Sequence, residues 1–112
     1  MWLVAAHSLA VGLGLLVAPD LVASVAGFGP VAPRFFARQA GVFHLVLATG
    51  YLAEHRRGGV ALLVAAKAFA FVFLMGSWLA GTPAWSLPLV GLGDGFMGLV
   101  AWLLWRRAAA GR

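Results

Sequence analysis

This 112-residue sequence contains no cysteine and few charged side chains. Without cysteine, the chain can form no disulfide bond, no thiolate metal site and no thiol redox centre. Charged residues make up 10% of the chain, only three residues are acidic, and 63% of the residues are hydrophobic. A soluble domain of this size needs a polar surface, and these side chains are too few to cover one. The composition therefore indicates a membrane protein.

Four long apolar stretches dominate the sequence. Each is long enough, at about 1.5 Å per helical residue, to cross a hydrocarbon core of about 30 Å. They are apolar nearly all round, which favours contact with lipid. Short connections make consecutive helices antiparallel neighbours. We therefore expect one all-α domain over residues 1–112, an integral membrane four-helix bundle running up-down-up-down. The stretches are Trp2–Ala18, Phe35–Ala53, Val60–Ala80 and Leu87–Trp105.

The connection between the first two stretches carries the clearest local signals. Pro19 ends the first helix because proline cannot continue it, and Asp20 is expected to cap the next segment. Residues 20–27 are then predicted to form a short helix or turn at the membrane interface. Pro33 is suited to the opening of the second helix.

The arginines predict the orientation of the chain. With four spans, the N-terminus, the second loop and the C-terminus lie on one side, and the opposite side holds only Arg34 and Arg38. The positive-inside rule places both termini in the cytoplasm of a multi-pass inner-membrane protein. Met1–Val4 has no positive side chain, so the first stretch is expected to be a retained span rather than a signal peptide. The net charge of +5 is interpreted as this orientation signal, not as a nucleic-acid surface. The arginines on the cytoplasmic side are Arg56, Arg57, Arg106, Arg107 and Arg112.

The aromatic residues that favour lipid headgroups fit the same topology. Tryptophan and tyrosine are enriched at both membrane surfaces. Trp78 and Trp85 fall at the outer ends of the predicted spans, and Tyr51 falls near an inner end. The sequence therefore predicts two aromatic belts, the inner one containing Trp2, Trp102 and Trp105.

Asp94 is the central candidate for a functional residue. An ionisable group within a span is costly, so it normally faces the interior of a bundle, finds a partner and serves a function. Gly91, Gly95 and Gly98 lie beside it at helical spacing, in a stripe of small residues that allows close approach of another helix. We expect Asp94 to be buried against neighbouring helices.

Further polar side chains fall at graded depths along the spans. Counting residues gives the order Arg38, Asp94, His44, Lys67 and His7 from the outer face, with Arg38–Asp94 as the expected charge pair. A pair of this kind can also have a purely structural role, which is to orient the helices. His44 shares a predicted helix face with the small residues Ala37, Gly41 and Ala48, and with Tyr51.

The Arg38–Asp94 pairing leaves Lys67 and His44 without partners at membrane depth, where lipid offers none. We therefore predict a ligand or partner cavity formed by Arg38, His44, Lys67 and Asp94. Its expected apolar walls are Phe71, Phe96 and Met97. In the alternative, Lys67 reaches the cytoplasmic interface, His44 bonds a backbone carbonyl, and the interior is dry.

These residues leave the cofactor open. A quinone or a lipid suits a polar interior, whereas a haem held by His7 with His44 or His55 is disfavoured by poorly matching axial spacings. No metal site is expected, because His7, His44 and Asp94 lie at different depths and would have to converge on one ion.

The chain resembles the small four-helix DoxX-like membrane proteins, including related domains of unknown function. The resemblance rests on Leu-Leu-Val-Ala-Pro-Asp at 15–20, Gly-Phe-Gly at 27–29 and Arg-Gln-Ala-Gly at 38–41. It implies a four-helix integral membrane fold, and some members of that group are linked to quinone-coupled oxidoreductases or act as accessory factors. Arg38 and Gly41 are the positions that map onto the motif, and no catalytic residue carries over.

Two functions are consistent with these observations. The first is a small accessory or binding protein of the membrane, whose polar interior takes a small amphipathic ligand or a partner subunit. Its partners would be the lipid bilayer and a homo-oligomer or larger membrane complex, with no nucleic acid. The second is a membrane-embedded enzyme or proton-coupled, quinone-linked component that uses Asp94, His44 and Lys67, because proton relays use such graded groups.

Overall fold

The computed structural model describes residues 1–30 and 32–112, and over these residues it contains helices and no strand. The all-α prediction is therefore confirmed. The helices follow the predicted apolar stretches closely, with one short additional helix. In chain order they are α1 (Trp2–Val17), α2 (Pro19–Val25), α3 (Arg34–Arg56), α4 (Ala61–Leu79) and α5 (Ser86–Ala110).

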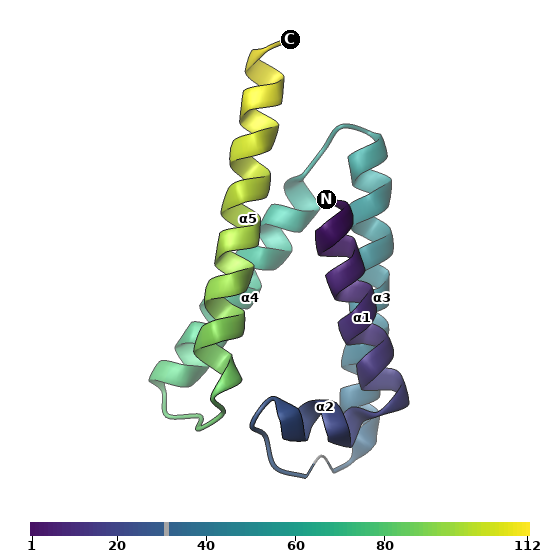
Figure 1. Ribbon diagram of the computed structural model, residues 1–112, viewed down its shortest axis with the longest axis vertical. Helices are drawn as coiled ribbons and strands as arrows, with labels where there is room; N and C mark the ends of the chain where they lie inside the picture. The colour runs from purple at the N-terminus through teal and green to yellow at the C-terminus, as the bar shows by residue number, and fades with distance from the viewer. Residues whose placement is uncertain (31) are drawn as a thin grey trace.

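The four long helices form two hairpins. α1 packs along α3 and α4 packs along α5, whereas contacts between the hairpins are confined to a few places (Figure 1). The short helix α2 turns away from α1 by 118° and lies across one end of the molecule (Figure 1). This helix and the turn after it confirm the short element predicted over residues 20–27.

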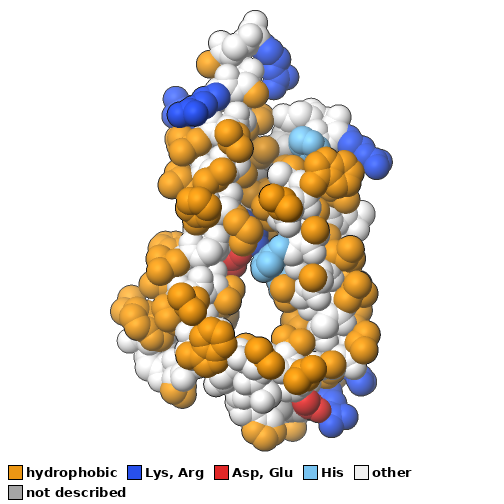
Figure 2. Space-filling view, in the orientation of Figure 1, with side chains coloured by type: hydrophobic (Ala, Val, Ile, Leu, Met, Phe, Trp, Pro, Cys, Tyr) orange, Lys and Arg blue, Asp and Glu red, His pale blue; other side chains and the backbone are white. Residues whose placement is uncertain are grey.

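The hairpins meet at both ends of the molecule. Near the N-terminus, Val4, Tyr51 and Leu63 form a buried cluster that joins α1, α3 and α4. At the opposite end, the indole Nε1 of Trp85 donates to the carbonyl of Val25 at 3.1 Å. The hydroxyl of Ser86 donates there to the carbonyl of Ala26 at 2.6 Å. Between these two junctions the space-filling view shows an opening through the molecule (Figure 2).

Small residues hold each hairpin together. A Cβ atom added to Gly41 would lie 2.7 Å from the carbonyl oxygen of Gly12, so the backbones of α1 and α3 nearly touch at this crossing. In the other hairpin, a Cβ on Gly91 would lie 3.1 Å from the sulfur of Met75, and one on Gly98 would lie 3.0 Å from the Cβ of Lys67. The predicted close approach of a helix to the glycine stripe of α5 is confirmed, and α4 is that helix.

Polar residues at the helix ends depart partly from expectation. α1 ends at Val17, just before Pro19, as predicted, whereas Pro19 itself is the first residue of α2. Asp20, however, makes no side-chain cap, because it lies in the first turn of α2, after the N-cap residue Ala18. Its carboxylate binds the guanidinium of Arg34 at 2.7 Å. Glu54 makes a contact that the sequence did not predict: its carboxylate accepts from the backbone N–H of Leu62, at 2.9 Å for the closer oxygen, and so caps the start of α4.

Two helices, α4 and α5, are long and apolar enough to cross a membrane, and the bent pair α1–α2 would be a third span if counted as one. Large apolar side chains are exposed on all four long helices. Leu3 is 87% exposed and Phe69 is 77% exposed, for example. Exposed apolar surface on this scale marks a membrane or protein contact. The two candidate spans and the exposed apolar surface are consistent with the predicted membrane protein.

Candidate functional site

Lys67 and Asp94 form a buried ion pair between α4 and α5. The Nζ of Lys67 lies 2.6 Å from Oδ1 of Asp94, and the two residues are 4% and 6% exposed. Gly98 lies one helical turn after Asp94 on the same face of α5. Because Gly98 has no side chain, the Cβ of Lys67 can pack against this point of α5, within reach of Asp94. The lysine chain can then lie along α5 and reach the carboxylate without leaving the helix interface.

Asp94 is buried, as predicted, but the expected Arg38–Asp94 pair is wrong. Asp94 is paired with Lys67, and Arg38 is exposed on α3. Arg38 therefore does not join the other predicted site residues. The alternative in which Lys67 reaches the cytoplasmic interface is also wrong, since the lysine is buried at the α4–α5 contact.

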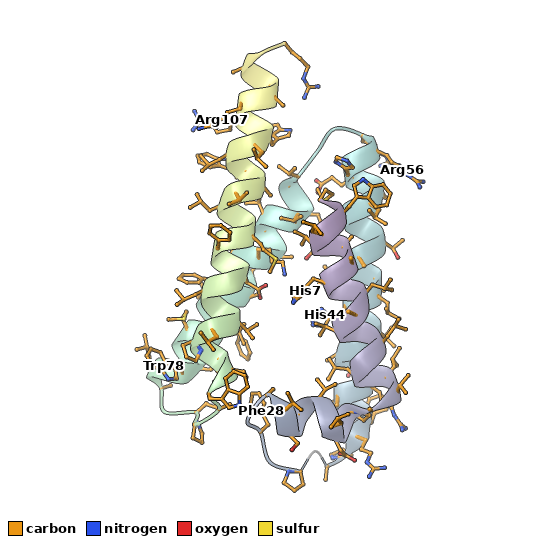
Figure 3. All side chains as sticks on the ribbon, viewed as in Figure 1. His7, Phe28, His44, Arg56, Trp78 and Arg107 are labelled. Carbon is orange, nitrogen blue, oxygen red and sulfur yellow. The ribbon has the colours of Figure 1, made fainter. Side chains whose placement is uncertain are left out.

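His44 and His7 face the space between the hairpins. Figure 3 shows both rings pointing from α3 and α1 toward that space. The Nδ1 atom of His44 is buried and has no hydrogen-bond partner among the described residues. The imidazole lies within electrostatic range of Lys67, His7 and Asp94. The site therefore combines a buried ion pair on one hairpin with two imidazoles on the other.

Tyr51 belongs to the surroundings of this site rather than to a membrane belt. It is 1% exposed and packs in the junction with Val4 and Leu63. It also lies within electrostatic range of Asp94. The sequence contained a signal for this position, because Tyr51 lies seven residues after His44 and therefore on the same helix face. The buried face of α3 that was predicted from Gly41, Ala48 and Tyr51 is confirmed.

The expected apolar walls of the site lie elsewhere. Phe71 and Phe96 line a groove on the α4–α5 hairpin that does not include His44, Lys67 or Asp94. Met97 packs against the buried cluster at the hairpin junction. The walls of the space beside His44 are therefore the facing sides of the two hairpins themselves.

Within the described residues, no group of three or more histidine, aspartate or glutamate side chains is arranged to hold a metal ion. Comparison with protein-family models, with curated proteins and with solved structures gives no match. The resemblance to DoxX-like proteins consequently stays a prediction, and the function is inferred from the geometry and chemistry of the site.

The chemistry of the site is that of a hydrogen-bonding surface. Lys67 and Asp94 largely neutralise each other, so a ligand bound beside the pair needs no charge of its own. A neutral imidazole has one donor nitrogen and one acceptor nitrogen. The buried Nδ1 of His44 makes no hydrogen bond of either kind within the described residues. A buried polar atom without a partner costs free energy, which a guest with a hydroxyl or carbonyl group can recover.

Proposed function

We propose that this chain is a small integral protein of the cytoplasmic membrane that binds a small amphipathic ligand between its two hairpins. In this proposal α1, α3, α4 and α5 all cross the bilayer as an up-down-up-down unit, with both termini in the cytoplasm. The observation that carries the ligand site is the buried, unpartnered Nδ1 of His44, whose ring points toward the opening beside the Lys67–Asp94 pair (Figure 3).

The placement of all four helices in the bilayer is supported by the surface of the protein. α3 has 23 residues, which lies between the lengths of the candidate spans α4 (19 residues) and α5 (25 residues), and it exposes Phe35, Phe43 and Val46. The five tryptophans are all exposed, as residues at membrane surfaces would be. Trp2 and Trp105 belong to the helix ends that carry most arginines, and Trp78 and Trp85 to the opposite ends.

The absence of cysteine allows a direct test of this topology. Arg57 in the α3–α4 turn and Pro83 in the α4–α5 turn are both exposed. In right-side-out bacterial membrane vesicles, a membrane-impermeant maleimide should label Pro83→Cys, and should label Arg57→Cys only after the membrane is permeabilised. Labelling of Arg57→Cys in intact vesicles would contradict the orientation.

The ligand class is inferred from the shape and polarity of the space. Its rim is largely apolar, as the hydrophobic side chains around the opening show (Figure 2), whereas His44 supplies a polar anchor. Binding sites for small molecules commonly combine apolar walls with a few polar groups that fix orientation. An apolar molecule with one carbonyl or hydroxyl head, such as a quinone or a lipid, has this distribution. A partner subunit that presents such a group in a helix would satisfy the same anchor.

Replacing His44 tests this site. An alkylated benzoquinone added to the detergent-solubilised protein should bind saturably, and His44→Leu should weaken binding about ten-fold, because one desolvated hydrogen bond is worth about 1 kcal/mol or slightly more. Binding is followed by quenching of tryptophan fluorescence. His55→Gln is the control, because His55 is exposed at the end of α3 and rests against Trp2. Equal affinities for wild type and His44→Leu would rule out this anchor.

A second candidate function is proton-coupled or enzymatic chemistry, and the observation that favours it is the set of titratable groups at one place. Lys67, Asp94 and two imidazoles within electrostatic range resemble the groups of a proton relay. Reconstituted vesicles separate the two functions. Turnover of the quinone, or proton movement that Asp94→Asn abolishes, would favour the relay, whereas binding without either would favour the binding protein.

A further inference from the structure

A groove on the α4–α5 hairpin is separate from the site between the hairpins. It encloses about 520 Å³, and its lining is almost wholly apolar. The glycine stripe forms part of its floor, since Gly95 and Gly98 both line the groove. The residues that define its course are Trp102, Leu99, Gly98, Gly95, Phe71 and Leu92.

The length of the groove matches one leaflet of a bilayer. Leu92 and Trp102 are ten residues apart on α5, which corresponds to about 15 Å at about 1.5 Å per residue. Half of a hydrocarbon core of about 30 Å is the same distance. A single acyl chain that entered at Trp102 would therefore end near the middle of the membrane.

A cation lies at the entrance. The guanidinium carbon of Arg106 is 4.8 Å from the centre of the Trp102 ring, and Trp102 itself lines the groove. Stacking on an aromatic face orients the guanidinium and leaves its N–H groups free to donate. Those donors suit the oxygens of a phosphate, which arginine binds in a bidentate geometry, with two parallel N–H···O hydrogen bonds. The phosphate would thus sit at the headgroup level, directly above the apolar groove.

We propose that this groove binds one anionic phospholipid, with its phosphate on Arg106 and one acyl chain between α4 and α5. The charge at the entrance selects an anionic headgroup over a zwitterionic one, and the groove holds the chain. This inference rests on the membrane placement proposed above but not on the ligand site of His44. The two can therefore fail independently.

Native mass spectrometry of the detergent-solubilised protein tests the proposal. The protein is equilibrated with phosphatidylglycerol and phosphatidylcholine that carry identical acyl chains. Wild type should retain one phosphatidylglycerol in preference to phosphatidylcholine. Arg106→Gln should lower that preference about five-fold, the factor that corresponds to about 1 kcal/mol per basic residue. Arg107→Gln is the matched control, since it removes the same charge one residue along but leaves the Arg106 contact on Trp102 intact, and it should lower the preference less than Arg106→Gln does.

A second pair of variants tests the groove itself. Ala68 and Ala65 are both exposed on α4, but only Ala68 is among the residues that line the groove. Ala68→Phe should fill the groove and reduce retention of both lipids, whereas Ala65→Phe should retain them as wild type does. Equal retention of the two lipids by wild type, an unchanged preference in Arg106→Gln, or unchanged retention in Ala68→Phe would each overturn the proposal. None of these variants touches His44, so quinone binding should persist in all of them.

Discussion

Asp94→Asn is expected to destabilise the protein more than the loss of any other carboxylate. The substitution leaves the ammonium group of Lys67 buried at the α4–α5 interface without its partner, 2.6 Å away in the wild type. Removing one member of a buried ion pair costs about 3–5 kcal/mol, because the remaining charge is uncompensated. The free energy of unfolding in mild detergent, followed by circular dichroism, measures this loss.

The double variant Asp94→Asn with Lys67→Met separates the contribution of the ion pair to stability from the contributions of its two residues. Methionine retains much of the length of the lysine chain beside Gly98 without its charge, so the double variant should be more stable than Asp94→Asn alone. Asp20→Asn serves as the surface control: its ion pair with Arg34 is about half exposed, and such pairs contribute at most about 1 kcal/mol. Simple additivity of the Asp94 and Lys67 losses would show that the two residues do not stabilise each other.

Asp94 pairs with Lys67 and not with the predicted Arg38, and this difference shows the limit of prediction from sequence. Counting residues along a span gives the depth of a side chain, but it gives neither its direction around the helix nor the identity of the neighbouring helix. Depth alone places Arg38 near Asp94, yet Arg38 is exposed on α3. Gly98, one turn after Asp94, does indicate a position where a residue of another helix can pack closely. Only the packing of α4 on α5 shows that this residue is Lys67.

The helices themselves could be predicted because long apolar runs separated by proline and glycine allow few other structures. The inward face of α3 could also be predicted from its periodicity. The opening beside His44 could not be predicted in this way. It depends on where the two hairpins meet, and one junction is made by Trp85 and Ser86 with carbonyls 60 residues earlier in the chain. Contacts at such separation leave no local pattern.

Gly41→Leu is expected to separate α1 from α3. A Cβ atom at this position would lie 2.7 Å from the carbonyl oxygen of Gly12, and a backbone atom cannot move aside as a flexible side chain can. Overpacking of this kind costs about 1–3 kcal/mol and sometimes more. The helix propensity of leucine is about 1 kcal/mol better than that of glycine and acts in the opposite direction. The measured change in the free energy of unfolding should therefore be a net loss.

Gly76→Leu is the control for this prediction, because Gly76 is also helical but a Cβ there has nothing within 4 Å. It should leave the protein as stable as wild type or slightly more so. If the two variants behaved alike, the close crossing of α1 and α3 would be contradicted. The crossing also positions the two imidazoles, since α1 carries His7 and α3 carries His44 (Figure 3). Any Gly41→Leu protein that remains folded should therefore bind the benzoquinone more weakly, whereas Gly76→Leu should bind it as wild type does.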